Sequence, residues 1–542
     1  MAKPEHAIHD QTNLLEKRRL IIVFAALASA LLITYIDQQS IGVVLPTVGR
    51  DLNSSSTIIW AGTSSMIANT AFQVLYGRMS DIFGRKVMLL TCLCLLAVGD
   101  VLCGFAQTGP QLYAFRGISG LANGGIMALS MMIVSDVTTL EERGKYQGIL
   151  GSCVGLGSSI GPFIAASFTE SVSWRATFWF IAPCAVVVAI ALYFLLPPQT
   201  IPPEPLKTKL AKVDWAGIVL SSSGTILLLI PLSGIGTQFK PNDPMVIAMF
   251  TLGSVLLFAF GINEWKIARL PMLPFRLFKN PALAAMLIQN FLIGIVFYAL
   301  VYILPIYFQT AREMSILVSA ALIVPIVMPQ AIASALSGQY ISRMGRYGEV
   351  IWTGYILWVI GTGLHIAFSR TFPLAAIIVI LVVEGFGVGL VFQPTLVAAQ
   401  AHSPKPDRAV VISARNFIRS LGGAGGLAIA SAIFSNTIVN KMPDGIPEEL
   451  GRRIREAVFE VPDMTGLGDG QKDLVLDLYA QAAKSVFYLW FAAMAVCLGL
   501  MVFIKDKGLT RNDGPEQKAS GASSVVDSAE SPNVGKVAGA TK

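Results

Sequence analysis

Three ionisable residues lie inside long apolar runs of the sequence: Asp37, Arg116 and Glu384. An ionisable side chain within a bilayer costs at least a few kcal/mol, so such a residue is expected to have a function. A buried carboxyl group exchanges a proton according to its surroundings, and a nearby guanidinium favours proton release. Asp37 and Arg116 lie at similar depths in their runs, so we expect an ion pair or a shared water between them. These two residues and Glu384 are candidates for proton coupling; the plainer interpretation of each is a structural hydrogen bond to a neighbouring helix.

The surrounding sequence has the composition of a membrane protein with many spans. Of its 542 residues, 54% are hydrophobic and 13% are charged, and the mean hydropathy is +0.64. A soluble domain carries about 25% charged residues. Runs of about 20 apolar residues, long enough to cross the hydrocarbon core as a helix, recur along most of the chain.

Polar breaks divide these runs into about fourteen predicted transmembrane helices, which makes the expected fold an all-α polytopic membrane protein. The predicted spans are 20–46, 57–77, 87–106, 111–135, 146–168, 175–196, 214–236, 244–265, 282–309, 315–340, 349–369, 373–400, 409–434 and 482–504.

The formal net charge of +7 follows the loops of this topology. Lysine and arginine gather in alternate loops, which the positive-inside rule assigns to the cytoplasm. Both termini are then cytoplasmic, and the basic charge indicates topology rather than a nucleic-acid partner. The bases of the predicted inner loops include Lys17, Arg18, Arg19, Arg78, Arg85, Lys86, Arg143, Lys145, Arg343, Arg346, Lys505 and Lys507.

An internal repeat is visible in two of these loops. The segment GRMSDIFGRK at 77–86 returns as GQYISRMGRY at 338–347, in the equivalent place of a second set of six spans. Gly77 matches Gly338 and Gly84 matches Gly345, whereas Ser342 stands where the first copy has Asp81. Repeats of this kind are typical of alternating-access transporters.

The loop and its position resemble the hallmark of the major facilitator superfamily. The resemblance implies two six-helix halves, here with two inserted helices, and a conformational latch at the loop. The plainer interpretation is a basic inner turn. The latch residues implied are Gly77, Asp81, Gly84, Arg85, Lys86, Gly338, Gly345 and Arg346.

Further motifs narrow the resemblance. The run GLGSSIGPFIAA is similar to the antiporter motif of drug:proton antiporters through Gly157, Gly161 and Pro162, although alanines replace its final glycine pair. A generic packing face of small residues would look similar. With DQQSIGVVLP at 37–46 and LYAFRGISG at 112–120, the chain resembles the fungal fourteen-span drug:proton antiporters, a group that exports drugs, toxins and secondary metabolites.

The repeat and the spans predict the domain organisation. Residues 1–19 form a cytoplasmic tail, 20–197 a six-helix bundle, 198–281 a linker with two extra helices, 282–505 the second six-helix bundle, and 506–542 a disordered cytoplasmic tail. Within the second bundle, 435–481 form an outer loop; its EELGRRIREAV segment is interpreted as solvated, with a short amphipathic helix or a lid as alternatives. Asn53 begins a glycosylation sequon, but its closeness to the membrane argues against modification.

Other polar residues of the spans receive plainer interpretations. We expect Asp100 to be interfacial, His365 to be packed or to sense pH, and Arg415 and Arg419 to snorkel or to meet lipid phosphates. Candidate substrate contacts, for which ordinary packing is an equal alternative, are Asn69, Gln73, Asn123, Asn290, Phe297, Tyr298 and Tyr302.

The expected function is proton-coupled efflux of small lipophilic molecules by alternating access. We expect a monomer in the plasma membrane, with the vacuolar membrane as the alternative. The alternatives are uptake or vacuolar transport of amino acids or siderophores, and a non-transporting sensor. No metal or cofactor is expected besides the coupling proton, because Cys92 and Cys94 point apart on a helix. An enzyme is not expected, because nucleotide loops and nucleophile–base patterns are absent from the sequence.

Overall fold

The computed structural model describes residues 16–508, except 55–56, 59, 198–204, 235–238, 240–242, 269, 405–406, 444–445, 447, 457–467 and 507. Most of the two predicted tails, 1–19 and 506–542, and part of the predicted outer loop 435–481 therefore lie outside the described residues.

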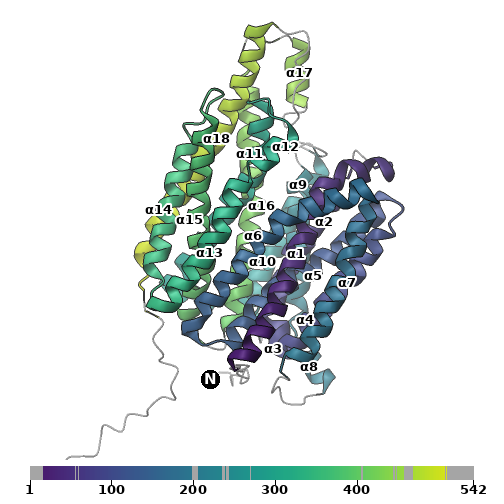
Figure 1. The fold of residues 1–542 in the computed structure, drawn as a ribbon, viewed down its shortest axis with the longest axis vertical. Coiled ribbons are helices and arrows are strands. Elements are labelled where there is room, and N and C mark those ends of the chain that lie inside the picture. Colours follow the sequence, from purple (N-terminus) through teal and green to yellow (C-terminus); the bar gives the residue numbers. More distant parts are fainter. Residues whose placement is uncertain are drawn as a thin grey trace, which may run out of the picture. The chain divides into compact units, whose positions relative to one another are not determined.

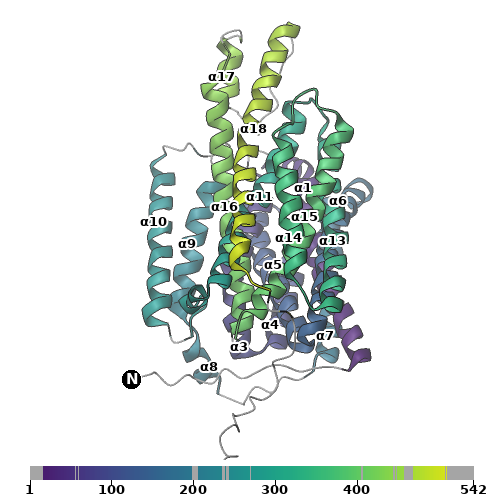
Figure 2. The ribbon, with the colours of Figure 1, turned by 90° about the vertical axis from the view of Figure 1, so that its left-hand side faces the viewer.

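The elements of the described part are helices (Figures 1 and 2). The first half consists of α1 (Lys17–Asp51), α2 (Trp60–Gln73), α3 (Leu75–Phe83), α4 (Arg85–Gly104), α5 (Gly109–Val137), α6 (Leu140–Ser171) and α7 (Trp174–Leu195). The linker carries α8 (Leu206–Lys212), α9 (Trp215–Gly234), α10 (Pro244–Ile262) and the short turns Asn263–Ile267 and Phe275–Lys279. The second half consists of α11 (Pro281–Thr310), α12 (Ile316–Ala321), α13 (Val324–Met344), α14 (Gly348–His365), α15 (Leu374–Ala401), α16 (Arg408–Asn440), α17 (Glu448–Glu456), α18 (Asp469–Leu500) and the final turn Met501–Phe503.

Helices lie at each of the fourteen predicted spans, and eleven helices of the described part are long and apolar enough to cross a membrane. The predicted span 57–77 is split into α2 and α3 at Val74. The span 315–340 is split because Pro325 lacks an N–H group and its ring clashes with the carbonyl of Ala321, where α12 ends. The span 349–369 is the shorter helix α14. The all-α multi-span prediction is confirmed.

The two halves pair their helices in the same way. In the first half α1 packs against α6, α2 against α5, and α4 against α5 and α7. In the second half α11 packs against α16, α13 against α15, and α14 against α15 and α18. The inserted helices α9 and α10 pack against each other, and α9 contacts α2 and α16. Duplication of a six-helix unit produces such a repeated pairing.

The halves contact each other near one end of the bundle. This end, where α1 begins and α18 ends, is called the basic end here. Gly77 of α3 lies against α16, because a Cβ added there would be 2.9 Å from Ser413 Oγ. Gly338 of α13 lies against α6, because a Cβ there would be 2.3 Å from Gly144 O. The matching glycines of the repeat thus both lie at contacts between the halves.

At the opposite end, α16, α17 and α18 differ from the predicted loop 435–481. The helix α16 continues to Asn440, and α18 already begins at Asp469. Polar residues end an apolar run without ending a helix, which explains the difference. The segment α17 is helical, and its Leu450 and Ile454 pack against the core of the second half, so its interpretation as a solvated loop is wrong.

Candidate functional site

Asp37 and Arg116 meet inside the first half. Arg116 Nη1 donates a hydrogen bond to Asp37 Oδ1 at 2.5 Å, and Asn123 Nδ2 donates to Asp37 Oδ2 at 2.6 Å. All three side chains are fully buried. Asp37 and Arg116 therefore form a direct ion pair rather than a contact through a shared water molecule. Asn123 binds the second oxygen of the Asp37 carboxylate.

Asp100 of α4 is a second carboxyl group in this cluster, so its interpretation as an interfacial residue is wrong. Its Oδ1 accepts a hydrogen bond from Ser119 Oγ at 2.8 Å and lies 3.9 Å from Arg116 Nη1. The neighbouring Gly99 allows α5 to approach, because a Cβ there would be 2.6 Å from Ser119 Oγ. We call Asp37, Asp100 and Arg116 the acidic cluster.

The acidic cluster holds two carboxyl groups against one guanidinium. When both carboxyl groups are ionised, the cluster carries one negative charge without a counter-charge, and burial makes that state costly. Uptake of one proton removes the excess charge. The arrangement can therefore hold and release a proton.

Glu384 of α15 lies in a separate buried site in the second half. Its Oε1 accepts a hydrogen bond from Trp358 Nε1 at 3.1 Å, and its Oε2 lies 3.1 Å from His365 Nε2. Phe368 and Trp490 surround the His365 ring, with ring centres 4.7 and 5.9 Å away. His365 is thus packed, as expected, but its contact with Glu384 was not predicted.

The first copy of the repeated loop forms a charged network. Arg85 Nη1 contacts Asp81 Oδ1 at 2.7 Å, and Arg85 Nε contacts Asp136 Oδ2 at 2.9 Å. Gly84 ends α3 with φ +98°, a conformation that favours glycine. Lys86 Nζ donates to the Leu196 carbonyl at 2.9 Å.

The same loop reaches the second half through Arg78. Its Nη2 lies 3.6 Å from Asp407 Oδ1, the residue that precedes α16, and its Nε donates to Pro271 O at 2.8 Å. Arg276 of the linker contacts the same Asp407 oxygen at 2.6 Å. Arg78, Asp407 and Arg276 therefore join the first half, the second half and the linker at the basic end.

The second copy of the loop also ends its helix at a glycine with positive φ, but its charged side chains pair only locally. Gly345 ends α13 with φ +68° and ψ 8°, whereas Gly84 has φ +98° and ψ 143°. Arg346 is largely exposed and pairs with Glu349 at 3.0 Å. Tyr340 Oη also donates a hydrogen bond to Glu349, at 2.5 Å.

The antiporter-like segment of α6 packs closely on α1. A Cβ added at Gly157 would be 2.8 Å from Tyr35 Cβ, and one at Gly161 would be 2.9 Å from the Ile36 carbonyl. Pro162 lies within the helix directly after this contact. The small residues therefore form a backbone-to-backbone contact, as their spacing indicates.

The predicted substrate residues fall into different environments. Gln73 Oε1 accepts from Ser420 Oγ at 3.2 Å and joins the halves. Asn290 donates to a carbonyl of its own helix at 2.7 Å. Asn123 belongs to the acidic cluster.

The remaining predicted contacts are less enclosed. Phe297 stacks edge-on against Phe392 with ring centres 5.1 Å apart, and Tyr298 lies 5.9 Å from Phe297. Tyr302 is 36% exposed, and Asn69 is partly buried in α2. Their role in substrate binding stays a prediction. The sequon residue Asn53 is exposed and has φ +49°, and the expectation that it is not glycosylated also stays a prediction.

Arg415 and Arg419 of α16 are buried by protein, so their interpretation as snorkelling or lipid-contacting residues is wrong. They are 3% and 8% exposed. Arg419 lies about 16 Å along the helix from Arg408, too deep for the expected membrane surface. Their burial depends on helices from distant parts of the sequence, so periodicity alone could not reveal it.

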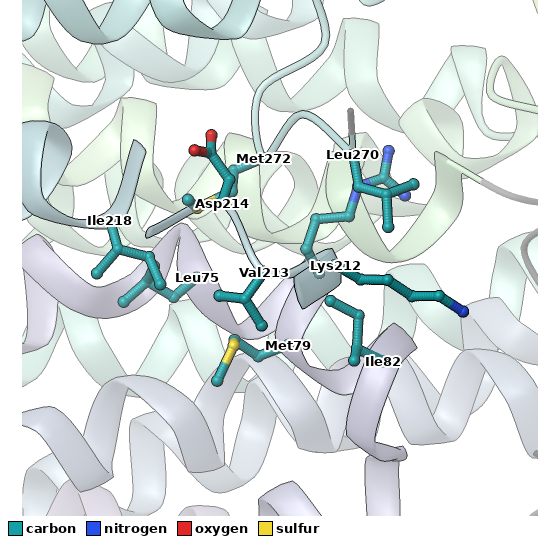
Figure 3. A pocket seen from close by; sticks show the side chains of 10 residues that line it. Leu75, Met79, Ile82, Lys212, Val213, Asp214, Ile218, Leu270 and Met272 are labelled. Carbon is teal, nitrogen blue, oxygen red and sulfur yellow. The ribbon is translucent and has the colours of Figure 1, made fainter. Parts of the chain in front are cut away.

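A small pocket lies at the basic end, beside the charged network. Leu75, Met79 and Ile82 of α3 line one side, and linker residues such as Val213 and Met272 line the other (Figure 3). Its lining is mostly apolar, so we interpret the pocket as a gap in the packing of the linker against the repeated loop.

Comparison with known proteins identifies the family of the chain. The Major Facilitator Superfamily model matches residues 27–427. Citrate exporter 1 of Yarrowia lipolytica (strain CLIB 122 / E 150) is 46% identical over 526 residues, which cover 97% of this chain and 77% of that protein. Efflux pump dotC of Dothistroma septosporum (strain NZE10 / CBS 128990) is 29% identical, covering 91% of this chain and 85% of the pump.

A solved structure supports the fold independently. The proton:xylose symporter XylE, bound to 6-bromo-6-deoxy-D-glucose, matches with a TM-score of 0.61 at 11% identity, over 92% of this chain and 98% of the symporter. Fungal efflux transporters among the relatives confirm the resemblance predicted from the motifs. This chain belongs to the major facilitator superfamily and is a multi-pass membrane transporter rather than an enzyme.

Proposed function

We propose that this transporter exports small organic carboxylates, of the di- and tricarboxylate class, in exchange for protons. The similarity to Citrate exporter 1 over 97% of the chain supports this substrate class. The coupling rests on one observation, the acidic cluster with two buried carboxyl groups and one guanidinium.

The cluster supplies a route for coupling. Movement of α1, α4 or α5 changes the distance from Arg116 to Asp37 or Asp100, and so changes how favourably the extra proton is held. A proton taken up in one conformation is then released in the other. Glu384 and His365 are a second candidate pair for the same chemistry.

The driving force is sufficient for export. One elementary charge that crosses about 100 mV supplies about 2.3 kcal/mol, which supports a roughly fifty-fold substrate gradient before any pH difference is added.

The contacts between the halves indicate the conformation. The cross-half hydrogen bonds involve residues such as Gln73, Ser135 and Ser152 on the first half, with Ser420, Gln400 and Ala331 opposite them. At the other end, the ion pairs of Asp51 with Arg175 and of Arg370 with Asp473 stay within single halves. With the basic end in the cytoplasm, as the positive-inside rule favours, this conformation faces outward.

Lipophilic compounds are a second candidate substrate class. The similarity to the efflux pump supports it, and so do the neighbouring aromatic side chains of Phe297, Tyr298 and Phe392. Such a lining suits apolar ligands.

The test uses the full chain in proteoliposomes with an imposed proton gradient. We expect wild type to move labelled citrate against its gradient and a protonophore to abolish this movement. In Asp37→Asn, gradient-driven transport should fall by at least about tenfold, since a charge-assisted hydrogen bond to Arg116 is lost.

The matched control is Asp51→Asn, on the same helix, where Asp51 contacts Arg175 at 2.6 Å and is half exposed. It should transport citrate like wild type. If wild type transported a lipophilic dye but not citrate, the second substrate class would be favoured. Gradient-driven transport that is unchanged in Asp37→Asn would exclude coupling through Asp37.

A further inference from the structure

Arg415 and Arg419 form a pair of buried cations on α16. They are one helical turn apart and therefore lie on the same face. Arg415 Nη2 donates to Phe392 O at 2.5 Å and to Thr395 Oγ1 at 2.9 Å, while Arg419 lies 5.1 Å from the centre of the Phe392 ring. Both side chains thus pack on the same turn of α15.

These contacts leave both positive charges without an anion. In the part of the chain that the structure describes, no carboxylate oxygen lies within 4.0 Å of either guanidinium. The Nε atoms of Arg415 and Arg419 are buried and have no hydrogen-bond acceptor. An uncompensated buried charge is costly, so such a pair is expected to receive a counter-ion.

The pair lies where the two halves of the transporter meet. Ser420, the residue after Arg419, donates to Gln73 of α2 at 3.2 Å. Within the second half, Gly294 allows α11 to approach the backbone of Arg419, because a Cβ there would be 2.0 Å from the Arg419 carbonyl oxygen.

We propose that Arg415 and Arg419 bind the carboxylates of the exported anion. The proposal rests on the proposed export of carboxylates and names the residues that recognise them. Two guanidinium groups match the charge of a dicarboxylate or of two carboxylates of a tricarboxylate, and arginine presents the planar donors that carboxylates accept. The acidic cluster of the first half and the basic pair of the second half then separate proton binding from anion binding.

The experiment measures exchange of labelled citrate in proteoliposomes preloaded with unlabelled citrate, without a proton gradient. Exchange reports substrate binding and conformational change, so it does not depend on proton coupling. We expect Arg415→Gln and Arg419→Gln to lower exchange about ten- to a hundredfold, and Arg419→Lys to retain more exchange than Arg419→Gln. Arg312→Gln is the matched control, because Arg312 also donates to a backbone carbonyl, that of Phe372 at 2.7 Å.

A measurement on wild type tests the substrate class without depending on whether the variants fold. Unlabelled di- and tricarboxylates should inhibit citrate exchange, whereas neutral and cationic lipophilic compounds should not. Wild-type exchange together with unchanged exchange in both glutamine variants would overturn the anion site and leave carboxylate export standing. Absence of citrate exchange in wild type would overturn both proposals.

Discussion

At the scale of single residues, the acidic cluster has more carboxyl groups than a simple ion pair needs. Asp37 and Asp100 share Arg116, and each also accepts a hydrogen bond from a neutral side chain, Asn123 or Ser119. The neutral partners hold each carboxyl group in place whether or not it carries a proton. Asp100 is therefore the residue whose removal should separate proton coupling from substrate movement.

Asp100→Asn should uncouple the transporter. The amide keeps the side chain's size and can still bond Ser119, but the cluster then holds one carboxylate and one guanidinium, with no excess charge to attract a proton. We expect citrate exchange to stay within about twofold of wild type and gradient-driven export to fall at least about tenfold, because the proton is no longer bound; tenfold corresponds to about 1.4 kcal/mol. Equal loss of exchange and of gradient-driven export would indicate a structural role instead.

At the scale of elements, glycines determine how closely the helices of the two halves approach. Gly77 lets α3 lie against α16, and Gly338 lets α13 lie against α6. These contacts close the basic end, so they must separate when the transporter opens there. Substitution of these glycines by larger residues should therefore change the equilibrium between the two conformations.

Gly338→Ala should favour the conformation that is open at the basic end. Its Cβ would meet Gly144 O at 2.3 Å, so α13 must move away from α6, and overpacking of this kind costs about 1–3 kcal/mol. Distances between spin labels on α6 and α13 at the basic end should lengthen, and transport should fall. Gly425→Ala, on α16, is the control, because a Cβ there meets nothing within 4 Å; equal distances in the two variants would contradict the expectation.

At the scale of the whole molecule, the basic end is held by charges from three parts of the chain. Asp407 accepts from Arg276 of the linker at 2.6 Å and lies 3.6 Å from Arg78 of the first half. The inserted helices are thereby connected to the contact between the halves. The linker can thus influence the conformational equilibrium without contacting the acidic cluster.

Asp407→Asn should weaken this closure. The charged contacts to Arg78 and Arg276 are lost together, and the share of molecules open at the basic end should rise about fivefold or more, for a loss of ~1 kcal/mol. Labelling of an introduced cysteine at the α3–α16 contact measures this share. Asp473→Asn removes the ion pair with Arg370 at the opposite end and should leave the labelling unchanged; a similar increase in both variants would show that the effect is not specific to the basic end.

The sequence by itself determined the class of the protein, the positions of its apolar spans and its repeated loop. Apolar run length and the alternation of basic loops are local properties, and so is the preference of Gly84 and Gly345 for positive φ. The pairing of Asp37 with Arg116 was also expected, because their depths agree.

Only the tertiary structure decided which buried charges meet. Asp100 joins Arg116 through the close approach of α4 and α5, and His365 joins Glu384 through that of α14 and α15. Arg415 and Arg419 looked like surface residues because they are near the start of an apolar run, yet α15 covers them. Burial and charge pairing depend on which helix faces pack together, and that information is spread over segments far apart in the chain.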